Sequence, residues 1–333
     1  MRLEIFKDFQ LIDMIYSYES FEHTRKFADC GEFSLILNNF IDINILSPNN
    51  IILVDNIPYI IENIHRYKNA NKTIETEVTG RSLKAILDRR VITNFTLNTN
   101  ITYEQQIYKL IQDNYINPSD NNKKVDFIKN ANLKNISLKP TQEISFENKY
   151  LLDLIIDICK LCNLGFNIKY LPEPRQMVFE VLEGNDLTND VVFSEQFNNI
   201  TDLEIYNQTK DYKNICYYKD NENINVIGTG TGLNRREEIV SGDISEAINL
   251  LENKKEALSI ECSVLSNEQF KYKIDWNLGD VVLIEDKGLN VFIEKRIIEI
   301  KETINENHYI ELVFGDKILN IYEKLGRKLY GRS

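Results

Sequence analysis

The chain has 333 residues, which is long enough for two or three domains that each bury a hydrophobic core. Hydrophobic residues make up 43% of the sequence and charged residues 27%, and no apolar run approaches the roughly 20 residues that a transmembrane helix needs. The 51 acidic and 39 basic side chains give a formal net charge of -12, which opposes binding to a phosphate backbone and excludes a protein that binds nucleic acid by affinity.

Residues 1–95 alternate short apolar segments with polar turns. Strands are predicted at LEIFK, FSLILN, IILVD, YIIENIHRY and TIETEVT and around residues 12–18. About six strands and one helix suit a small closed barrel, so we expect a first β-barrel-like domain here. The charged start of the chain lacks the apolar core of a signal peptide, and we therefore expect the protein to be made in the cytoplasm.

The most informative stretch of this domain is ETEVTGRSLKAILDRR, residues 75–90. Its strand-like alternation stops at Gly80. Leu83 and Leu87 then recur at helical spacing, while Lys84 falls on the opposite, polar face. A strand that turns into a helix needs a residue with backbone freedom, so Gly80 is expected at positive φ. The predicted helix ends in a basic pair that includes Arg90.

Residues 96–195 change to a mixture of helices and strands. Ile107 and Leu110 mark one helix that stops before the Asn-Pro pair at residues 117–118. The segment YLLDLIIDICKLCN predicts a second, strongly apolar helix that ends at Gly165, and the strands FNIKYL and QMVFEVL follow it. This part is predicted to be an α/β insert domain.

Strands return in residues 196–318. They are predicted at DLEIYNQTK, NICYYK, INVIG and REEIV, and in four further segments that end with ELVFG. A helix is predicted at about residues 245–257, with Asp243 at its N-cap. We expect a second β-barrel-like domain with a helical excursion, followed by a basic C-terminal tail at residues 319–333.

Five groups of residues follow one another in the order and spacing of a known protein family. They are Gly31, Glu32 and Phe33; Gly80, Leu83, Leu87 and Arg90; Gly184 and Asp186; Lys213 and Asn214; and Asp275, Leu278, Gly279, Asp280 and Val282. This pattern resembles the tail-hub, or baseplate-hub, proteins of long-tailed bacteriophages and phage-tail-like bacteriocins. The resemblance spans roughly residues 20–315. One departure is at Asn185 and Leu187, where the family has more polar and basic residues.

The resemblance implies an α+β fold with two β-barrel-like domains of the tail-tube type, an α/β insert and a helical excursion. It also implies a structural function, in which three copies form a ring that adapts the sixfold tail tube to a threefold spike or tip. The implied partners are two further copies, the tail tube protein above, the spike or tip protein below and other baseplate proteins. The implied location is the host cytoplasm during assembly and then the tail tip of a virion or bacteriocin particle.

The pair Cys159 and Cys162 forms the one C-x-x-C pattern in the chain. A redox pair is expected at a helix N-terminus and a zinc site needs a second pair, whereas this pair lies at the end of an apolar helix. Burial as two small apolar side chains is therefore favoured. The five cysteines are an odd number, which argues against a disulfide framework and fits a reducing compartment.

Three other patterns are interpreted as structural. The glycines of residues 228–232 favour a flexible hairpin turn over a phosphate loop, because a strand and not a helix follows them. Residues 275–286 contain acidic positions of a calcium loop, but a turn with Gly279 at positive φ and a packed Trp276 explains them better. The histidines His23, His65 and His308 stand in strand-like contexts without the pattern of a catalytic triad.

These patterns predict no enzyme, and no catalytic, metal or cofactor site. Two alternatives of another class stay open: a tail-associated cell-wall hydrolase, and a receptor-binding module. The sequence does not separate a siphophage, a contractile phage and a bacteriocin as the source of the tail.

Overall fold

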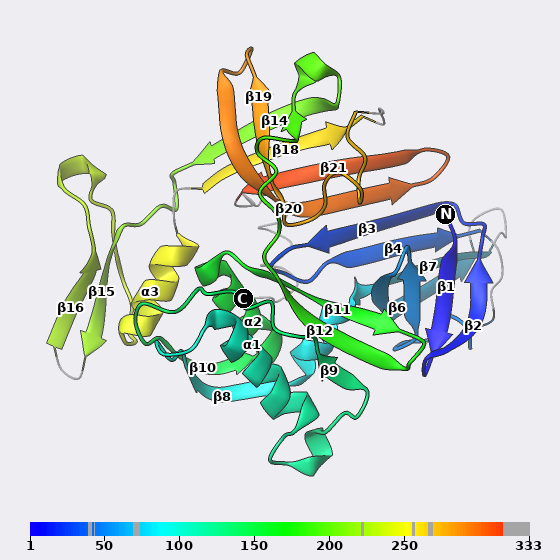
Figure 1. Cartoon of the computed structure of the whole chain (residues 1–333), viewed down its shortest axis with the longest axis horizontal. Helices are drawn as coiled ribbons and strands as arrows, with labels where there is room; N and C mark the ends of the chain where they lie inside the picture. The colour runs from blue at the N-terminus through cyan, green and yellow to red at the C-terminus, as the bar shows by residue number, and fades with distance from the viewer. Residues whose placement is uncertain are drawn as a thin grey trace.

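The computed structural model describes residues 1–38, 42, 44–68, 74–220, 223–254, 257–265 and 269–315. Within these residues one long sheet of thirteen strands runs through both β-rich parts of the chain, and smaller sheets lie beside it (Figure 1). The expected α+β class with β-rich domains is confirmed. No helix in the described part is long and apolar enough to cross a membrane.

Seven strands make up what we call the first β region. They are β1 (Leu3–Lys7), β2 (Gln10–Ile15), β3 (Ser20–Lys26), β4 (Glu32–Leu37), β5 (Ile51–Val54), β6 (Ile57–Lys68) and β7 (Ile74–Ser82). Their side chains alternate between core and surface, as in β4, where Phe33, Leu35 and Leu37 are buried. Strand β3 is not evident from the sequence, because SFEHTRK contains a single apolar side chain, Phe21, among polar and charged ones.

Strand β7 continues past Gly80, and the 3-10 helix η1 (Leu83–Arg89) begins only after Ser82. Gly80 is not among the glycines with positive φ, so the expected switch of backbone conformation at this residue is wrong. A different constraint acts at Gly80, namely the close approach of the neighbouring strand β6.

The α/β region contains two helices, short helical turns and two small sheets. Its elements are β8 (Val91–Thr96), α1 (Tyr103–Ile111), η2 (Gln112–Ile116), η3 (Asn121–Lys123), β9 (Ile128–Asn130), β10 (Ser145–Tyr150), α2 (Leu151–Cys162), β11 (Gly165–Leu171) and β12 (Gln176–Leu182). Both predicted helices are confirmed. Helix α1 begins at a capping box between Thr102 and Gln105, and α2 ends where Asn163 adopts the left-handed conformation.

The second β region consists of β13 (Val192–Phe193), β14 (Ile200–Gln208), β18 (Ala257–Val264), β19 (Val281–Asp286), β20 (Val291–Ile304) and β21 (His308–Gly315), with the 3-10 turn η4 (Glu195–Phe197). The strand order of the long sheet is β14-β18-β21-β20-β3-β4-β7-β6-β5-β1-β2, with β19 joined to β20 and β13 joined to β19. The two β regions therefore meet where β20 pairs with β3.

A side sheet projects from the second β region at the left of Figure 1. It contains β15 (Ile215–Asp220), β16 (Asn223–Gly228), the turn η5 (Gly232–Asn234) and β17 (Glu237–Ile239), and it is followed by α3 (Ile244–Asn253), which is capped by Asp243. Strand β15 lies between β16 and β17. The glycine-rich residues 228–232 therefore cross the end of β15 and do not form the expected hairpin turn.

Three large apolar cores hold these regions together. One core fills the first β region, and a second fills the second β region. The largest core joins helices α1 and α2 and helix η1 to Phe6 and Ile60 of the first β region, and Ile248 of α3 packs on it as well.

The division at residues 95 and 195 stays a prediction, and the C-terminal tail at residues 319–333 lies outside the described residues.

Candidate functional site

The ring of Phe27 lies where the first β region, the α/β region and the second β region meet. It follows β3 and is 2% exposed. Its backbone nitrogen donates to Ile298 O (2.9 Å), and its carbonyl accepts from Phe166 N (3.2 Å). The guanidinium carbon of Arg296 lies 5.0 Å from the ring centroid. One residue is thus bonded to all three parts, and we call this place the Phe27 junction.

Glycines allow the surrounding backbone to approach the Phe27 ring. A Cβ atom on Gly165 or on Gly279 would lie closer than 3.0 Å to ring carbons, a separation that real Cβ atoms do not show. Gly279 also has a φ of +96°, which confirms the predicted turn. Gly184 crosses directly over this turn, and Arg296 Nη1 donates to the carbonyls of Glu183 (2.6 Å) and Gly279.

The buried carboxylate of Asp280 fixes the segment that enters the second β region. It accepts from the backbone nitrogen of Asn185 (2.8 Å), from the Asn185 side-chain amide (3.0 Å) and from Asn277 N (2.8 Å). Asn185, where the sequence departs from the family pattern, is therefore a partner of a motif residue. Asp186 points away from this contact, and its carboxylate closes its own turn by accepting from Thr188.

The helical spacing predicts a polar face for Lys84, and this prediction is wrong. Its side chain is 5% exposed, and its ammonium donates to the carbonyls of Lys26 (2.6 Å) and Asp29 (2.9 Å). The same ammonium lies 4.5 Å from the centroid of the Phe166 ring. Burial lowers the pKa of Lys84 to about 8. Lys84 thus ties the end of β3 to the α/β region beside Phe27.

The motif residues Gly31, Phe33 and Gly80 act in the packing of adjacent strands. A Cβ atom on Gly80 would lie 2.8 Å from Phe33 Cε1 and still closer to the carbonyl oxygen of Ile60. At this point the pairing of β6 with β7 shifts register between Ile61 and Asn63. Gly31 likewise lies against the backbone of β3, and its carbonyl accepts from Ser82 N (2.8 Å).

The last residues of the ETEVTGRSLKAILDRR motif join the two neighbouring regions. Leu83 and Leu87 are each 1% exposed and belong to the largest core. Arg90 lies over the Tyr115 ring, with 4.6 Å between the guanidinium carbon and the centroid, and donates to the carbonyls of Asn114 (3.3 Å) and Lys123 (3.2 Å).

The motif residue Asn214 directly precedes β15 of the side sheet, whereas Asp275 and Leu278 precede Gly279 in the chain. The side chain of Asn214 donates to Asn234 O (2.7 Å) and accepts from Arg236 N (2.8 Å), so it holds the loop that crosses β15 in the side sheet. Asp275 accepts from Lys271 N (2.7 Å). Leu278 packs on the core of the second β region, where Trp276 is 1% exposed, so the interpretation of this tryptophan as a packing residue is confirmed.

Buried ionisable groups gather at the seam between β3 and β20, and the sequence patterns do not identify them as a group. His23 Nδ1 and the Tyr59 hydroxyl are 2.8 Å apart, and His23 Nε2 is 3.5 Å from a carboxylate oxygen of Glu302. The other Glu302 oxygen is 3.1 Å from His308, and Lys273 is 3.9 Å from the carboxylate. His23 and Glu302 are each 1% exposed.

Burial sets the protonation of His23, whereas a hydrogen bond and neighbouring charges set that of Glu302. Burial lowers the pKa of His23 to about 4, although the charge of Glu302 opposes this shift. Burial raises the pKa of Glu302, but the hydrogen bond with His308 and the charges of His23 and Lys273 outweigh it and bring the value to about 2. At neutral pH the seam therefore holds a neutral His23 beside a charged Glu302.

Cys159 and Cys162 are buried in the largest core, as expected. Burial raises the pKa of Cys162 to about 12, so this thiol carries no thiolate character at neutral pH. No group of three histidine, cysteine or acidic side chains that could hold a metal ion occurs in the described part of the chain.

Residues 3–316 match the model of the family described as Siphovirus ReqiPepy6 Gp37-like protein. No curated protein matches the sequence. The fold is similar to three solved tail proteins. These are the tail protein from Neisseria meningitidis MC58 (TM-score 0.58, 12% identity, 95% of this chain and 96% of that chain), the 43 kDa tail protein of prophage MuSo2 from Shewanella oneidensis (0.58, 14%, 94% and 96%) and the prophage tail protein gp18 from Listeria monocytogenes EGD-e (0.54, 13%, 99% and 99%). At these identities the similarity shows a shared fold.

Proposed function

The chain belongs to the Siphovirus ReqiPepy6 Gp37-like protein family, and from this membership we propose that it is a structural hub protein of a phage or phage-like tail. Three copies form a ring at the tail tip or baseplate. The tail tube protein lies above the ring, the spike or tip protein lies below it, and other baseplate proteins surround it. Because each chain offers two β-rich parts, three chains present six docking positions to a sixfold tube.

The pairing of β3 with β20 is the observation that carries this proposal. Backbone pairs from Lys26 opposite Glu299 to Phe21 opposite Ile304 make the two β regions parts of one sheet. The contacts around Phe27 add a second connection beside this pairing. An adaptor needs its two docking shapes at a fixed angle, and a shared sheet supplies that rigidity where a linker would not.

The ends of the long sheet provide surfaces on which a ring could close. Strand β2 is the last strand at one end, and β14 is the last at the other. Leu11 and Ile12 of β2 are 44% and 38% exposed. A sheet edge with unpaired backbone groups and exposed apolar side chains favours pairing with a neighbouring chain. In the proposed ring of three chains, neighbouring copies would cover these sheet edges.

Reconstruction of the assembled tail by electron cryomicroscopy tests the proposal. We expect three copies of this chain in one ring at the tip, and we expect the two β regions to superpose on each other by a rotation of about 60° around the tail axis. The α/β region and the helix α3 are expected to face away from the tube. A ring of six identical chains would contradict the adaptor mechanism.

The alternative of a cell-wall hydrolase has its own test. The purified chain is expected to leave no cleared band in a gel that contains bacterial cell walls, with lysozyme as the positive control. A cleared band that is removed by heat treatment of the protein would favour the enzyme over the structural hub.

A further inference from the structure

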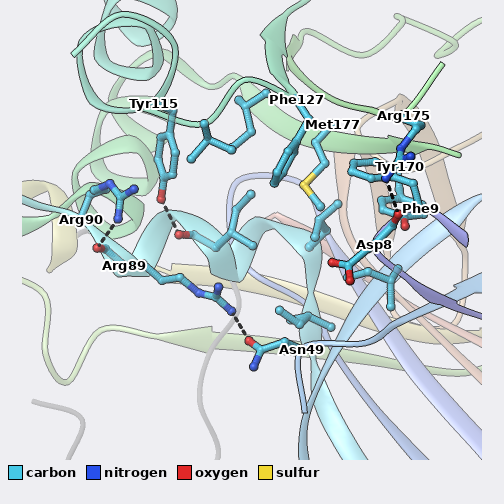
Figure 2. A pocket seen from close by; sticks show the side chains of 16 residues that line it. Asp8, Phe9, Asn49, Arg89, Arg90, Tyr115, Phe127, Tyr170, Arg175 and Met177 are labelled. Atoms are coloured by element: carbon cyan, nitrogen blue, oxygen red, sulfur yellow. Dashed lines mark hydrogen bonds between the residues drawn. The ribbon is translucent and has the colours of Figure 1, made fainter. Parts of the chain in front are cut away.

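A pocket of about 460 Å³ lies between the first β region and the α/β region (Figure 2). This volume is within the range of pockets that bind ligands. The turn between β1 and β2 contributes Asp8 and Phe9, helix η1 contributes Arg89, and the hairpin of β11 and β12 contributes Tyr170 and Arg175. Two hairpin tips and a helix thus line this space.

Aromatic side chains form the middle of the pocket. The Phe9 ring is stacked on Tyr170, with centroids 4.8 Å apart and an interplanar angle of 3°, and it meets Phe127 edge-on at 5.3 Å. Phe127 is 42% exposed at the mouth of the pocket. Phe9 has a φ of 65°, which a bulky residue rarely adopts. The turn between β1 and β2 therefore holds this ring in the pocket wall against a local backbone preference.

Arginines stand at both ends of this aromatic surface (Figure 2). Arg89 donates to the side-chain oxygen of Asn49 (2.8 Å), and Arg175 donates to the carbonyl oxygen of Asp8 (3.0 Å). Arg90 donates to the backbone carbonyls of Asn114, Arg89 and Lys123. Among the described residues none of these three guanidinium groups is paired with a carboxylate.

Some other arginines of this acidic chain pair with carboxylates, whereas Arg25 donates to Tyr272 and Asn277 and Arg296 donates to backbone carbonyls. Arg81 pairs with Glu62 (2.8 Å) and Asp88 (3.0 Å), and Arg235 pairs with Glu237. Asp8 is the one acidic side chain among the sixteen residues that line the pocket. The pocket thus combines three arginines and one aspartate with apolar surface in its middle.

We propose that this pocket binds a short, extended peptide segment in which acidic residues flank a large apolar side chain. The apolar side chain would lie against Phe9, Tyr170 and Phe127, and the carboxylates would accept from Arg89 at one end and from Arg175 at the other. Guanidinium groups hold carboxylates through two parallel hydrogen bonds, and the aromatic surface adds burial of apolar area.

Charge decides which segment fits. Residues 317–333 of this chain, KILNIYEKLGRKLYGRS, are basic and would be repelled by the arginines. A segment with acids at both ends offers a carboxylate to each arginine position, whereas a small monocarboxylate offers one carboxylate in total. The assignment of the segment to another tail protein rests on the proposed function. The binding of an acidic peptide to the pocket does not depend on that function.

Isothermal titration calorimetry on the full chain tests the proposal. The probes are acetylated, amidated hexapeptides with two glutamates at each end and two central residues drawn from phenylalanine, tyrosine, tryptophan, leucine and methionine. The comparison probes have lysine ends, or central glycine and serine, and phenylacetate represents a free small carboxylate. The test variant carries Arg89→Gln with Arg175→Gln. The matched control is Arg235→Gln, which removes an exposed arginine outside the pocket.

We expect at least one acidic peptide with an apolar centre to bind, and the double variant to bind it at least about tenfold more weakly, since charge-assisted hydrogen bonds are lost. The Arg235→Gln variant should bind as the unchanged protein does. No binding by any of these peptides, equal binding by the double variant, or equal binding of the glycine-serine peptide or phenylacetate would overturn the proposal. The place of the chain in the tail is measured separately by microscopy, so either proposal can fail alone.

Discussion

The neutral His23 at the seam predicts a specific dependence of stability on pH. The folded protein holds the pKa of this imidazole at about 4, whereas the ordinary value is 6.5. Between these two values the unfolded chain binds a proton that the folded chain does not. The free energy of unfolding therefore falls as the pH falls through this range, at about 1.4 kcal/mol per pH unit, for a total loss of about 3 kcal/mol.

Glu302 acts in a lower pH range. Its folded-state pKa of about 2 lies below the ordinary 4.5, so its stabilising contribution is complete above pH 4.5 and is lost as the pH falls through 2. The effects of the two groups overlap only at and below about pH 4.5. Measurements between pH 7 and pH 5 therefore report on His23 and not on Glu302.

Urea unfolding of the protein and of the His23→Gln variant at pH 7, 6 and 5 measures this effect. The difference in the free energy of unfolding between the two proteins should change by about 2 kcal/mol across this range, because glutamine binds no proton. The matched control is His65→Gln, which replaces a histidine whose side chain is 69% exposed and which lies outside the seam. If the protein and the His23→Gln variant lose stability in parallel, His23 does not stay neutral in the seam and the reasoning fails.

Four further variants test the packing. Gly80→Ala should lower the free energy of unfolding by about 3 kcal/mol, because the new methyl group meets the backbone of β6. Gly232→Ala should lower it by about 1 kcal/mol because of the positive φ at this residue, since no atom lies within 4 Å of the added carbon. Chemical denaturation measures both values. Phe27→Ala should lower the free energy of unfolding by about 3 to 5 kcal/mol and raise the rate of proteolysis between the β regions. Cys159→Ser with Cys162→Ser should cost about 1 to 3 kcal/mol without loss of any bound metal, measured by elemental analysis.

These variants have clear contrary outcomes. Equal stability of the two glycine variants would exclude close strand packing as the constraint. Phe127→Ala is the control for Phe27→Ala, because its ring is 42% exposed and its loss should cost little. A metal ion or disulfide that disappears in the double serine variant would contradict the interpretation of the cysteines as packed apolar side chains.

Local patterns predict those parts of the structure that depend on neighbouring residues in the sequence. The alternation in FSLILN and the apolar run of residues 150–163 correspond to β4 and α2, and the glycine of the DWNLGD turn has the expected positive φ. The burial of Lys84 could not be predicted in this way, because its acceptors are carbonyls near residue 27 that helical spacing does not reveal.

The site depends on pairings over long sequence distances. His23 and Glu302 come together only because β3 pairs with β20, and no periodicity within either strand indicates that partner. The same holds for Gly80, whose constraint comes from Ile60 in another strand. Five motif groups could be found by their order, but which of them surround Phe27 follows from the tertiary structure alone. The superposition of the two β regions stays a prediction.

The pairing of β3 with β20 also has a consequence for synthesis on the ribosome. Phe21 can pair with Ile304 only after Ile304 has been translated, which happens roughly 15 to 60 seconds later at usual elongation rates. During that time the nascent first β region exposes an unpaired strand edge, which favours association with other chains. A product that terminates before β20 never covers this edge. Completion of the chain is therefore coupled to the covering of this strand edge, and truncated copies are expected to associate more readily than the full chain.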